Sequence, residues 1–314
     1  MYESLLNAIE HYDKIVIHRH RQPDLDALGS QLGLRGLIHG NFSGKQVRLV
    51  GDENDYAYIG SMDTVDDAFY EGALAIILDV SQHARISDDR YHLAEERVVV
   101  DHHLNTSDLD AKVLSFPEHI AVCQILTDMA MRHDLCVDAE TATYLFAGLV
   151  TDSGRFRYPQ VNALTFRSAA FLVERGARHQ WLYKKLYTES LAVKKLKGHV
   201  VNHFQTTPHG VAFMKNDRTV MDTYEVSFFT VSRGMVNQMA GIKGIPVWVN
   251  LTEDHEGVIH CEIRSEAIPV VEVAKRYGGG GHGLACGCTF ASWQETDQLL
   301  ADLDRLVAEE SEAL

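Results

Sequence analysis

The chain contains 314 residues, of which 46% are hydrophobic and 23% are charged, and its formal net charge is −15 at pH 7. This length predicts two domains, and the negative charge argues against a surface for long nucleic acid but leaves open a short anionic substrate. The five cysteines include no CxxC pair, and neither a membrane-spanning apolar run nor a secretory signal is visible. We therefore expect a cytoplasmic protein without a membrane partner.

The first half of the chain alternates strand-like and helix-like stretches. Strands are predicted at 14–18, 46–51, 73–79 and 97–101, and a helix at 26–39. This βαβ order predicts a mostly parallel sheet covered by helices. Further helices are predicted at 120–132, 139–150 and 162–175, and the charged amphipathic stretch 181–203 predicts one long connecting helix.

The alternation restarts in the second half of the chain. Strands are predicted at 211–215, 247–251, 258–264 and 284–290, and helices at 270–277 and from 293 onward. We therefore predict an α/β protein with three parts. These are an N-terminal domain at 1–190, whose parallel sheet has helices on both faces, a connecting helix or linker at 191–204, and a smaller C-terminal α/β domain at 205–314.

The first cluster of chemically active side chains follows the first predicted strand. His20, Asp24 and Asp26 lie close together there, and Pro23 keeps the residue before it out of a helix. Two carboxylates so near each other repel unless a cation lies between them. Asp26 could instead cap the following helix, but a cap would not account for His20.

Three further clusters follow later elements. Asp79 ends an apolar strand, the run Asp101-His102-His103 follows another, and Asp152 follows an apolar helical run. Each could be a turn or capping group when taken alone. However, ligands of an open α/β sheet bind at the carboxyl ends of its strands. Carboxylates with a minority of imidazoles suit Mn²⁺ or Mg²⁺, and this number of ligands suits a pair of ions about 3.5–4 Å apart.

These four clusters resemble, in order, the four motifs of the DHH phosphoesterase superfamily. The motifs are H-x-x-x-D-x-D at 20–26, the solitary Asp79, D-H-H at 101–103 and G-x-x-x-D at 148–152. The resemblance implies that one metal ion is held by His20, Asp24 and Asp79, and a second by Asp26, Asp79, His102 and Asp152. It also implies that His103 faces the phosphate and that Asp101 orients a ligand histidine. Ser153 stands where the family often has Thr, and no expected ligand is lost.

A glycine-rich segment marks the second half. Four glycines at 278–281 precede His282, and Arg264 and Ser265 end an earlier strand. Glycines let a backbone approach a ligand closely and offer N–H groups to phosphate, although such a run can also be a flexible loop and Arg264 a surface ion pair. The pattern resembles the DHHA1 substrate-binding domain. This resemblance implies that substrate is bound by Arg264, Ser265, Gly279, Gly280, Gly281 and His282.

A basic and aromatic segment directly follows Asp152. It contains Arg155, Phe156, Arg157 and Tyr158. The arginines could touch phosphate and the aromatic rings could stack on a base. The alternative is that the arginines are solvated and that the rings pack in the core.

Within the superfamily, the chain most resembles the bacterial nanoRNase A type. The resemblance implies a hydrolase that degrades very short RNA oligonucleotides to mononucleotides and removes the 3′-phosphate of 3′-phosphoadenosine 5′-phosphate. Two divalent metal ions are implied as cofactors, with Mn²⁺ as the expected ion, and a homodimer is left open. The alternatives are a linear or cyclic dinucleotide phosphodiesterase and a non-catalytic nucleotide sensor.

Overall fold

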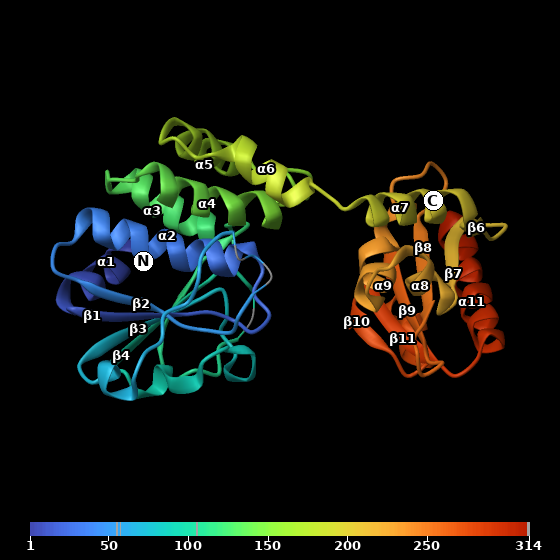
Figure 1. Cartoon of the computed structure of the whole chain (residues 1–314), viewed down its shortest axis with the longest axis horizontal. Coiled ribbons are helices and arrows are strands. Elements are labelled where there is room, and N and C mark those ends of the chain that lie inside the picture. The colour runs from blue at the N-terminus through green and yellow to red at the C-terminus, as the bar shows by residue number, and fades with distance from the viewer. Residues whose placement is uncertain (55, 57, 105, 313–314) are drawn as a thin grey trace. The chain divides into compact units, whose positions relative to one another are not determined.

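The computed structural model of the chain describes residues 1–54, 56, 58–104 and 106–312. The chain divides into two compact units, Met1–Tyr187 and Thr188–Leu314, and each has its own sheet and its own core (Figure 1). Within the described ranges, no helix is both long enough and apolar enough to cross a membrane.

The first unit is built on a five-stranded parallel sheet with the order β2-β1-β3-β4-β5. The strands are β1 (Lys14–His18), β2 (Gln46–Leu49), β3 (Ala73–Leu78), β4 (Glu96–Asp101) and β5 (Lys112–Ser115). All residues of β3 are buried, as expected for a parallel strand covered on both faces. The predicted parallel sheet is confirmed, and β5 is an additional edge strand that its short, mostly exposed sequence did not reveal.

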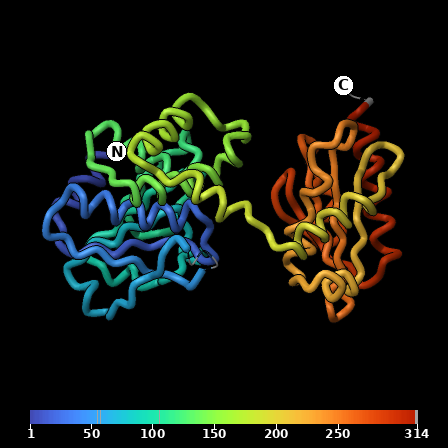
Figure 2. Tube along the Cα trace, turned by 45° about the horizontal axis from the view of Figure 1, so that its top comes forward, coloured from blue at the N-terminus to red at the C-terminus, as the bar shows by residue number. Residues whose placement is uncertain are grey.

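Six α-helices lie on one side of this sheet, and the last two of them, α5 and α6, pack on α3 and α4 as an outer layer (Figures 1 and 2). They are α1 (Tyr2–His11), α2 (Leu25–Asn41), α3 (Val122–Arg132), α4 (Ala139–Asp152), α5 (Ala163–Glu174) and α6 (His179–Tyr187). Glycines of α2 face α4 so closely that a Cβ atom on Gly29 would overlap the Tyr144 carbonyl, and one on Gly33 would overlap Leu145. The two helices are therefore in close antiparallel contact, and the start of α2 lies beside the end of α4.

The opposite face of the sheet is covered by short 3-10 turns and loops. Val16, Ala75 and Val99 pack there against residues of these segments. The turns are η1 (Asp67–Tyr70), η2 (His83–Arg85) and η3 (Asp89–Leu93). Helical turns thus lie on both faces as predicted, but those on this face are short because the connections lack a sustained apolar period of 3.6 residues.

The second unit contains a six-stranded mixed sheet with the order β10-β11-β9-β8-β7-β6, in which only the β7–β8 pair is parallel. Its strands are β6 (Gln205–Thr206), β7 (Val211–Asn216), β8 (Val247–Glu253), β9 (Ile259–Ser265), β10 (Gly280–His282) and β11 (Ala285–Phe290). Helices α10 (Val271–Arg276) and α11 (Trp293–Glu312) cover one face, and α11 is the long helix beside this sheet in Figure 1. The other face packs against α7 (Leu191–His203), α8 (Thr219–Tyr224), α9 (Phe228–Met235) and η4 (Val236–Met239).

The single connecting helix predicted at 181–203 is wrong. The structure has two helices there, because α6 ends at Tyr187 and Ser190 caps a new helix by accepting a hydrogen bond from the Val193 amide. Leu196 and Val200 of α7 are fully buried in a core of the second unit. The segment predicted as a linker at 191–204 is therefore an integral helix of that unit.

Candidate metal centre

The predicted metal ligands meet at the carboxyl ends of three neighbouring strands. His20 follows β1, Asp79 follows β3 and His102 follows β4. Asp24 caps the start of α2 and Asp152 is the last residue of α4. The close contact of α2 with α4 brings these two helix ends to the same edge of the sheet, which is where α/β proteins bind their ligands.

One group of three ligands consists of His20, Asp24 and Asp79. The Nε2 atom of His20 lies 3.4 Å from Asp79 Oδ2 and 3.8 Å from Asp24 Oδ1. Asp24 Oδ1 also accepts hydrogen bonds from the amides of Asp26 and Ala27, at 2.9 and 3.0 Å. The helix cap is therefore Asp24, and the alternative in which Asp26 serves only as the cap is wrong.

A second group consists of Asp26, His102 and Asp152. The Nε2 atom of His102 lies 3.8 Å from Asp152 Oδ2 and 3.4 Å from Asp79 Oδ1. The buried Asp26 carboxylate accepts hydrogen bonds from the Val122 and Cys123 amides at the start of α3, at 2.7 and 2.8 Å. These amides hold Asp26 in place, and no sequence signal had linked α3 to the site.

Asp79 lies between the two groups. Its Oδ2 faces His20 and its Oδ1 faces His102, each at 3.4 Å. Asp79 Oδ1 and His102 Nε2 are buried, and neither forms a hydrogen bond within the described part of the chain. Buried polar atoms without partners are costly unless a ligand satisfies them. The donor set of carboxylate oxygens and imidazole nitrogens therefore fits a pair of divalent cations that share Asp79.

The electrostatics of the cluster point the same way. Burial, followed by the charges of Asp26, Asp24 and Asp79, raises the pKa of Asp152 to about 10. Burial disfavours protonated His20, but the Asp24 and Asp79 carboxylates outweigh it and raise the pKa of His20 to about 10. The protein alone thus keeps protons in a cluster of like charges, and divalent cations can replace those protons.

His103 is held at the edge of this cluster by Asp101. Asp101 Oδ1 lies 2.7 Å from His103 Nδ1 and accepts a hydrogen bond from the His103 amide at 3.0 Å. The His103 side chain is 39% exposed, whereas that of Asp101 is buried. His103 is also within reach of a cation, because its Nδ1 lies 3.6 Å from Asp79 Oδ1 and the three residues Asp79, His102 and His103 form a third potential ligand group.

Two neighbours of His20 have structural roles. His18 is buried, lies 3.0 Å from the Asp88 carbonyl through its Nδ1, and packs beside Tyr70 on the other side of the sheet. Arg19 is also fully buried and donates hydrogen bonds to the carbonyl oxygens of His20 and Asp52, at 3.0 and 2.6 Å. Arg19 thus fixes the backbone that carries His20, a role that its residue type alone did not predict.

Gly148, the first residue of the G-x-x-x-D motif, leaves room for Asp26. A Cβ atom at this position would overlap Cys123 Sγ and lie 2.6 Å from Asp26 Oδ1. We expect Gly148→Ala to lower the free energy of unfolding by about 1–3 kcal/mol through overpacking, and to displace Asp26. Urea unfolding checks this, with Gly198→Ala as the control. Nothing lies within 4 Å of a Cβ at Gly198 in α7, so its substitution should stabilise by roughly 0.5–1 kcal/mol.

The predicted substrate residues of the second unit gather on neighbouring strands. His282 pairs with Ala285, and Ala285 pairs with Arg264, so His282 and Arg264 lie on the same face of the sheet about 10 Å apart. Two residues along the strands, Gly280 pairs with Gly287 on this same face. Because neither glycine has a side chain, no side chain covers the backbone at these two positions. The predicted glycine loop is therefore partly the edge strand β10.

Two of the predicted substrate residues are engaged within the protein. Arg264 forms an ion pair with Glu262 at 3.0 Å, and the buried Ser265 hydroxyl accepts a hydrogen bond from the Ile268 amide at 2.9 Å. Gly279 and Gly281 have no room for a Cβ atom, because one on Gly279 would overlap the Gly287 carbonyl. These glycines are therefore required by the close approach of backbones, whether or not a phosphate binds.

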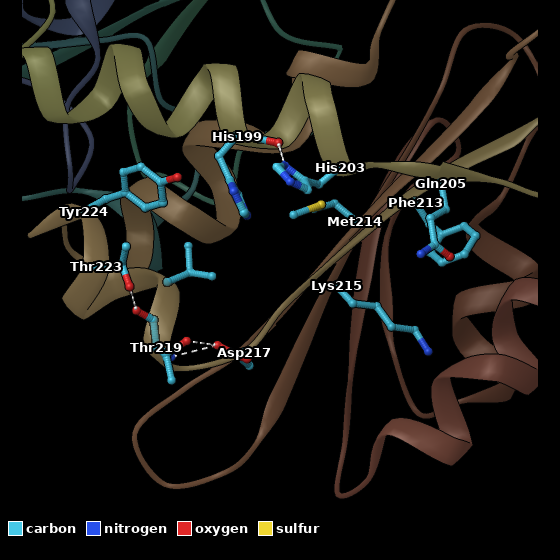
Figure 3. A pocket seen from close by; sticks show the side chains of 11 residues that line it. His199, His203, Gln205, Phe213, Met214, Lys215, Asp217, Thr219, Thr223 and Tyr224 are labelled. Carbon is cyan, nitrogen blue, oxygen red and sulfur yellow. Dashed lines mark hydrogen bonds between the residues drawn. The ribbon is translucent and has the colours of Figure 1, made fainter.

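A separate cavity of about 620 Å³ lies in the second unit and contains none of the predicted site residues. Its walls include His199, His203 and Tyr224 (Figure 3). Asp217 accepts a hydrogen bond from the Thr219 amide at 2.9 Å, and Lys215 extends away from the histidines to pair with Asp297 at 2.6 Å. The charged groups of this cavity are thus satisfied internally and do not point to a ligand.

Comparisons with known proteins agree with the two units. A profile of the DHH family N-terminal domain matches residues 14–149, and a profile of the DHHA1 domain matches residues 227–309. A Streptococcus mutans protein named "Probable bifunctional oligoribonuclease and PAP phosphatase NrnA" is 32% identical over 313 residues, which cover 98% of this chain and 99% of that protein. The chain belongs to this DHH/DHHA1 family.

Other members of the DHH/DHHA1 family align over the same length. The Bacillus subtilis protein named "Bifunctional oligoribonuclease and PAP phosphatase NrnA" is 31% identical over 98% of this chain and 99% of its own. The fold is shared with a crystal structure of an exopolyphosphatase-related protein from Bacteroides fragilis, with a TM-score of 0.81, 24% identity and coverage of 98% of this chain and 97% of that one. Arg264 and His282 fall within the DHHA1 match, and Asp152 lies just beyond the DHH match.

Proposed function

We propose that this protein is a metal-dependent phosphoesterase that hydrolyses very short RNA oligonucleotides to mononucleotides and removes the 3′-phosphate of 3′-phosphoadenosine 5′-phosphate. The observation that carries the proposal is the convergence of three aspartates and two histidines around a fourth aspartate, Asp79, at the carboxyl ends of β1, β3 and β4. The names of the two NrnA relatives, which align along nearly their whole length, supply the substrate class.

Each side chain of the cluster has a role in this proposal. His20, Asp24 and Asp79 hold one cation, and Asp26, Asp79, His102 and Asp152 hold the other. When bound, the cations offset the negative charge of the phosphate and lower the pKa of water at the site. His103, whose ring is fixed by Asp101, donates a hydrogen bond from Nε2 to a phosphate oxygen when it is protonated.

The second unit binds the nucleotide in this proposal. Arg264 and His282 share one face of its sheet, beside the bare backbone of Gly280 and Gly287. A phosphate at this face accepts hydrogen bonds from Arg264, His282 and the backbone amide of Gly280. Of the other residues predicted to bind substrate, Ser265 is buried on the opposite face of β9, and the Gly279 amide already donates a hydrogen bond to the Ala274 carbonyl at 3.0 Å. Gly281 stays a prediction. The phosphate has to replace Glu262 as the partner of Arg264, because these two side chains are paired in the protein alone.

The remaining parts of the proposal concern the ion, the partners and the location. We propose Mn²⁺ as the ion, because two imidazoles accompany the oxygen ligands. The net charge of −15 opposes binding of long nucleic acid. The five cysteines are free, which suits the reducing cytoplasm. We also propose that the domain boundary lies between Tyr187 and Thr188, in place of the predicted limits 1–190 and 205–314, and that a homodimer is one assembly to test.

The test is a cleavage assay with the full-length protein. A 5′-phosphorylated RNA dinucleotide, 3′-phosphoadenosine 5′-phosphate, cyclic di-AMP and pyrophosphate are each incubated with Mn²⁺, with Mg²⁺ and with EDTA. We expect cleavage of the first two substrates with Mn²⁺ and loss of at least about 10³-fold of that rate with EDTA. Cleavage of cyclic di-AMP alone would instead indicate a cyclic dinucleotide phosphodiesterase. Tight binding without cleavage of any substrate would indicate a non-catalytic nucleotide sensor.

A further inference from the structure

The loop that leaves the metal cluster has an unusual backbone. It follows Asp152 directly, and Gly154, Arg155 and Phe156 have φ angles of 55°, 61° and 61°. Residues with side chains rarely adopt this left-handed region, and such residues gather at functional sites. The conformation is held by hydrogen bonds from the Arg155 amide to the Val150 carbonyl at 2.8 Å and from the Phe156 amide to the Ser153 hydroxyl at 3.0 Å.

This loop places Arg155 beside an exposed tyrosine. The Arg155 guanidinium carbon lies 5.0 Å from the centre of the Tyr187 ring. The Tyr187 ring is tilted by 32° against the Tyr183 ring, and the two ring centres are 5.4 Å apart. Tyr187 is 41% exposed, and Arg157 is near enough for its charge to act on the same ring. We call Arg155, Arg157, Tyr183 and Tyr187 the basic aromatic patch.

The two arginines of this patch have no carboxylate partner among the described residues. Elsewhere in the chain, exposed arginines such as Arg132 and Arg233 pair with acidic side chains at 2.8 and 2.9 Å. In a chain with a net charge of −15, two neighbouring unpaired guanidinium groups form a local site that favours anions. The patch is also near the metal cluster, because three residues of chain limit the Cα atoms of Asp152 and Arg155 to about 11 Å.

We propose that the basic aromatic patch binds the part of a short oligonucleotide that adjoins the nucleotide at the metal centre. A base stacks on the Tyr187 ring, and the guanidinium groups of Arg155 and Arg157 contact the adjacent phosphate. This combination is the one with which proteins hold single-stranded nucleic acid without reading its sequence. The inference rests on the proposed function and deepens it, since 3′-phosphoadenosine 5′-phosphate has no second nucleoside to reach the patch.

The patch therefore favours oligonucleotides over a single bisphosphorylated nucleoside. We expect Arg155→Gln and Tyr187→Leu each to lower the ratio of kcat/KM for a 5′-phosphorylated RNA trinucleotide to kcat/KM for 3′-phosphoadenosine 5′-phosphate about tenfold, mainly through a higher KM for the trinucleotide. Tyr187→Phe, which keeps the aromatic ring, should have the same ratio as the wild-type protein. Arg155→Gln should also reduce the salt dependence of trinucleotide cleavage, because one phosphate contact is lost.

Arg175 supplies a matched control. It also lies over an aromatic ring, that of Phe171, at 4.9 Å. The next residue, Gly176, lies beside Ala139 at the start of α4, whereas Arg155 follows the end of α4. Since α4 is about 20 Å long, Arg175 lies at the end of this helix that is remote from the basic aromatic patch. Arg175→Gln should therefore leave the ratio unchanged.

The outcomes separate the two proposals. Wild-type protein that cleaves neither substrate with Mn²⁺ refutes the proposed function, and this inference falls with it. Wild-type protein that cleaves both, with Arg155→Gln and Tyr187→Leu shifting both substrates equally or not at all, refutes the patch alone. Wild-type protein that cleaves only the bisphosphorylated nucleoside also refutes the patch, because no oligonucleotide then uses it. Thermal melts of each variant exclude unfolding as the cause of a loss.

Discussion

Replacing Asp79 with Asn is expected to reduce phosphoesterase activity by about 10³-fold or more. The two oxygens of Asp79 face the two halves of the cluster, His20 on one side and His102 on the other. Asn retains the size of Asp and tolerates the φ of 60° at this position. The substitution therefore removes a shared charge with little change of the backbone, and both cation sites lose a ligand together.

Activity alone would not separate a lost cation from a disturbed fold, so the cations are counted as well. Titration calorimetry with Mn²⁺ should give two bound ions for the wild-type protein and at most one for Asp79→Asn. Asp128→Asn is a suitable control, because Asp128 is also buried in the first unit but pairs with Tyr2 and Arg132 at 2.8 Å. That control should melt at a lower temperature and keep its activity. An Asp79→Asn protein that binds two ions and retains a tenth of the activity would contradict the bridging role.

The candidate ligands could be predicted from sequence because the fold fixes where they go. In a parallel sheet the carboxyl ends of all strands point to one edge, so residues following β1, β3 and β4 meet there whatever the details of the loops. The convergence of His20, Asp79 and His102 follows from this rule and from the strand order. The division of work between Asp24 and Asp26 does not follow from it. They are two residues apart at one helix start, and only the amides of α3, about a hundred residues later, draw Asp26 inward.

The second unit shows a different limit of the sequence pattern. Residues 280–282 read as a glycine loop, since glycine disfavours strands. They form the edge strand β10 because β11 supplies backbone partners for them. The break between α6 and α7 was missed for a similar reason. The amphipathic spacing of the sequence continues across 188–190 and so predicts an unbroken helix. The helix is nevertheless interrupted there, and Ser190 caps the start of α7 by accepting a hydrogen bond from the Val193 amide.

Removing the divalent cations should make the protein progressively less stable as pH rises. Without cations, burial and the neighbouring carboxylates raise the pKa of Asp152 to about 10. Burial alone would lower the pKa of His102, but the Asp79 carboxylate outweighs it and raises that pKa to about 9. The folded state then binds more protons than the unfolded chain at pH 7 to 9. Stability carried by groups with raised pKa values is present at low pH and is lost as pH increases. The melting temperature of EDTA-treated protein should fall by roughly 5 °C, or about 2 kcal/mol, between pH 6.5 and 9.

Cations should reverse this trend, because they replace the protons that the cluster otherwise needs. At a concentration 100 times its Kd, a cation adds about 2.7 kcal/mol, and the gain grows with pH as competition from protons fades. Differential scanning calorimetry with and without Mn²⁺ across this pH range measures both effects. Asp152→Asn is the matched variant, since it removes a carboxylate whose pKa is raised to about 10 and should flatten the pH dependence of the metal-free protein. Equal pH dependence with and without Mn²⁺ would mean that the cluster does not exchange protons for cations, and the metal centre would have to be abandoned.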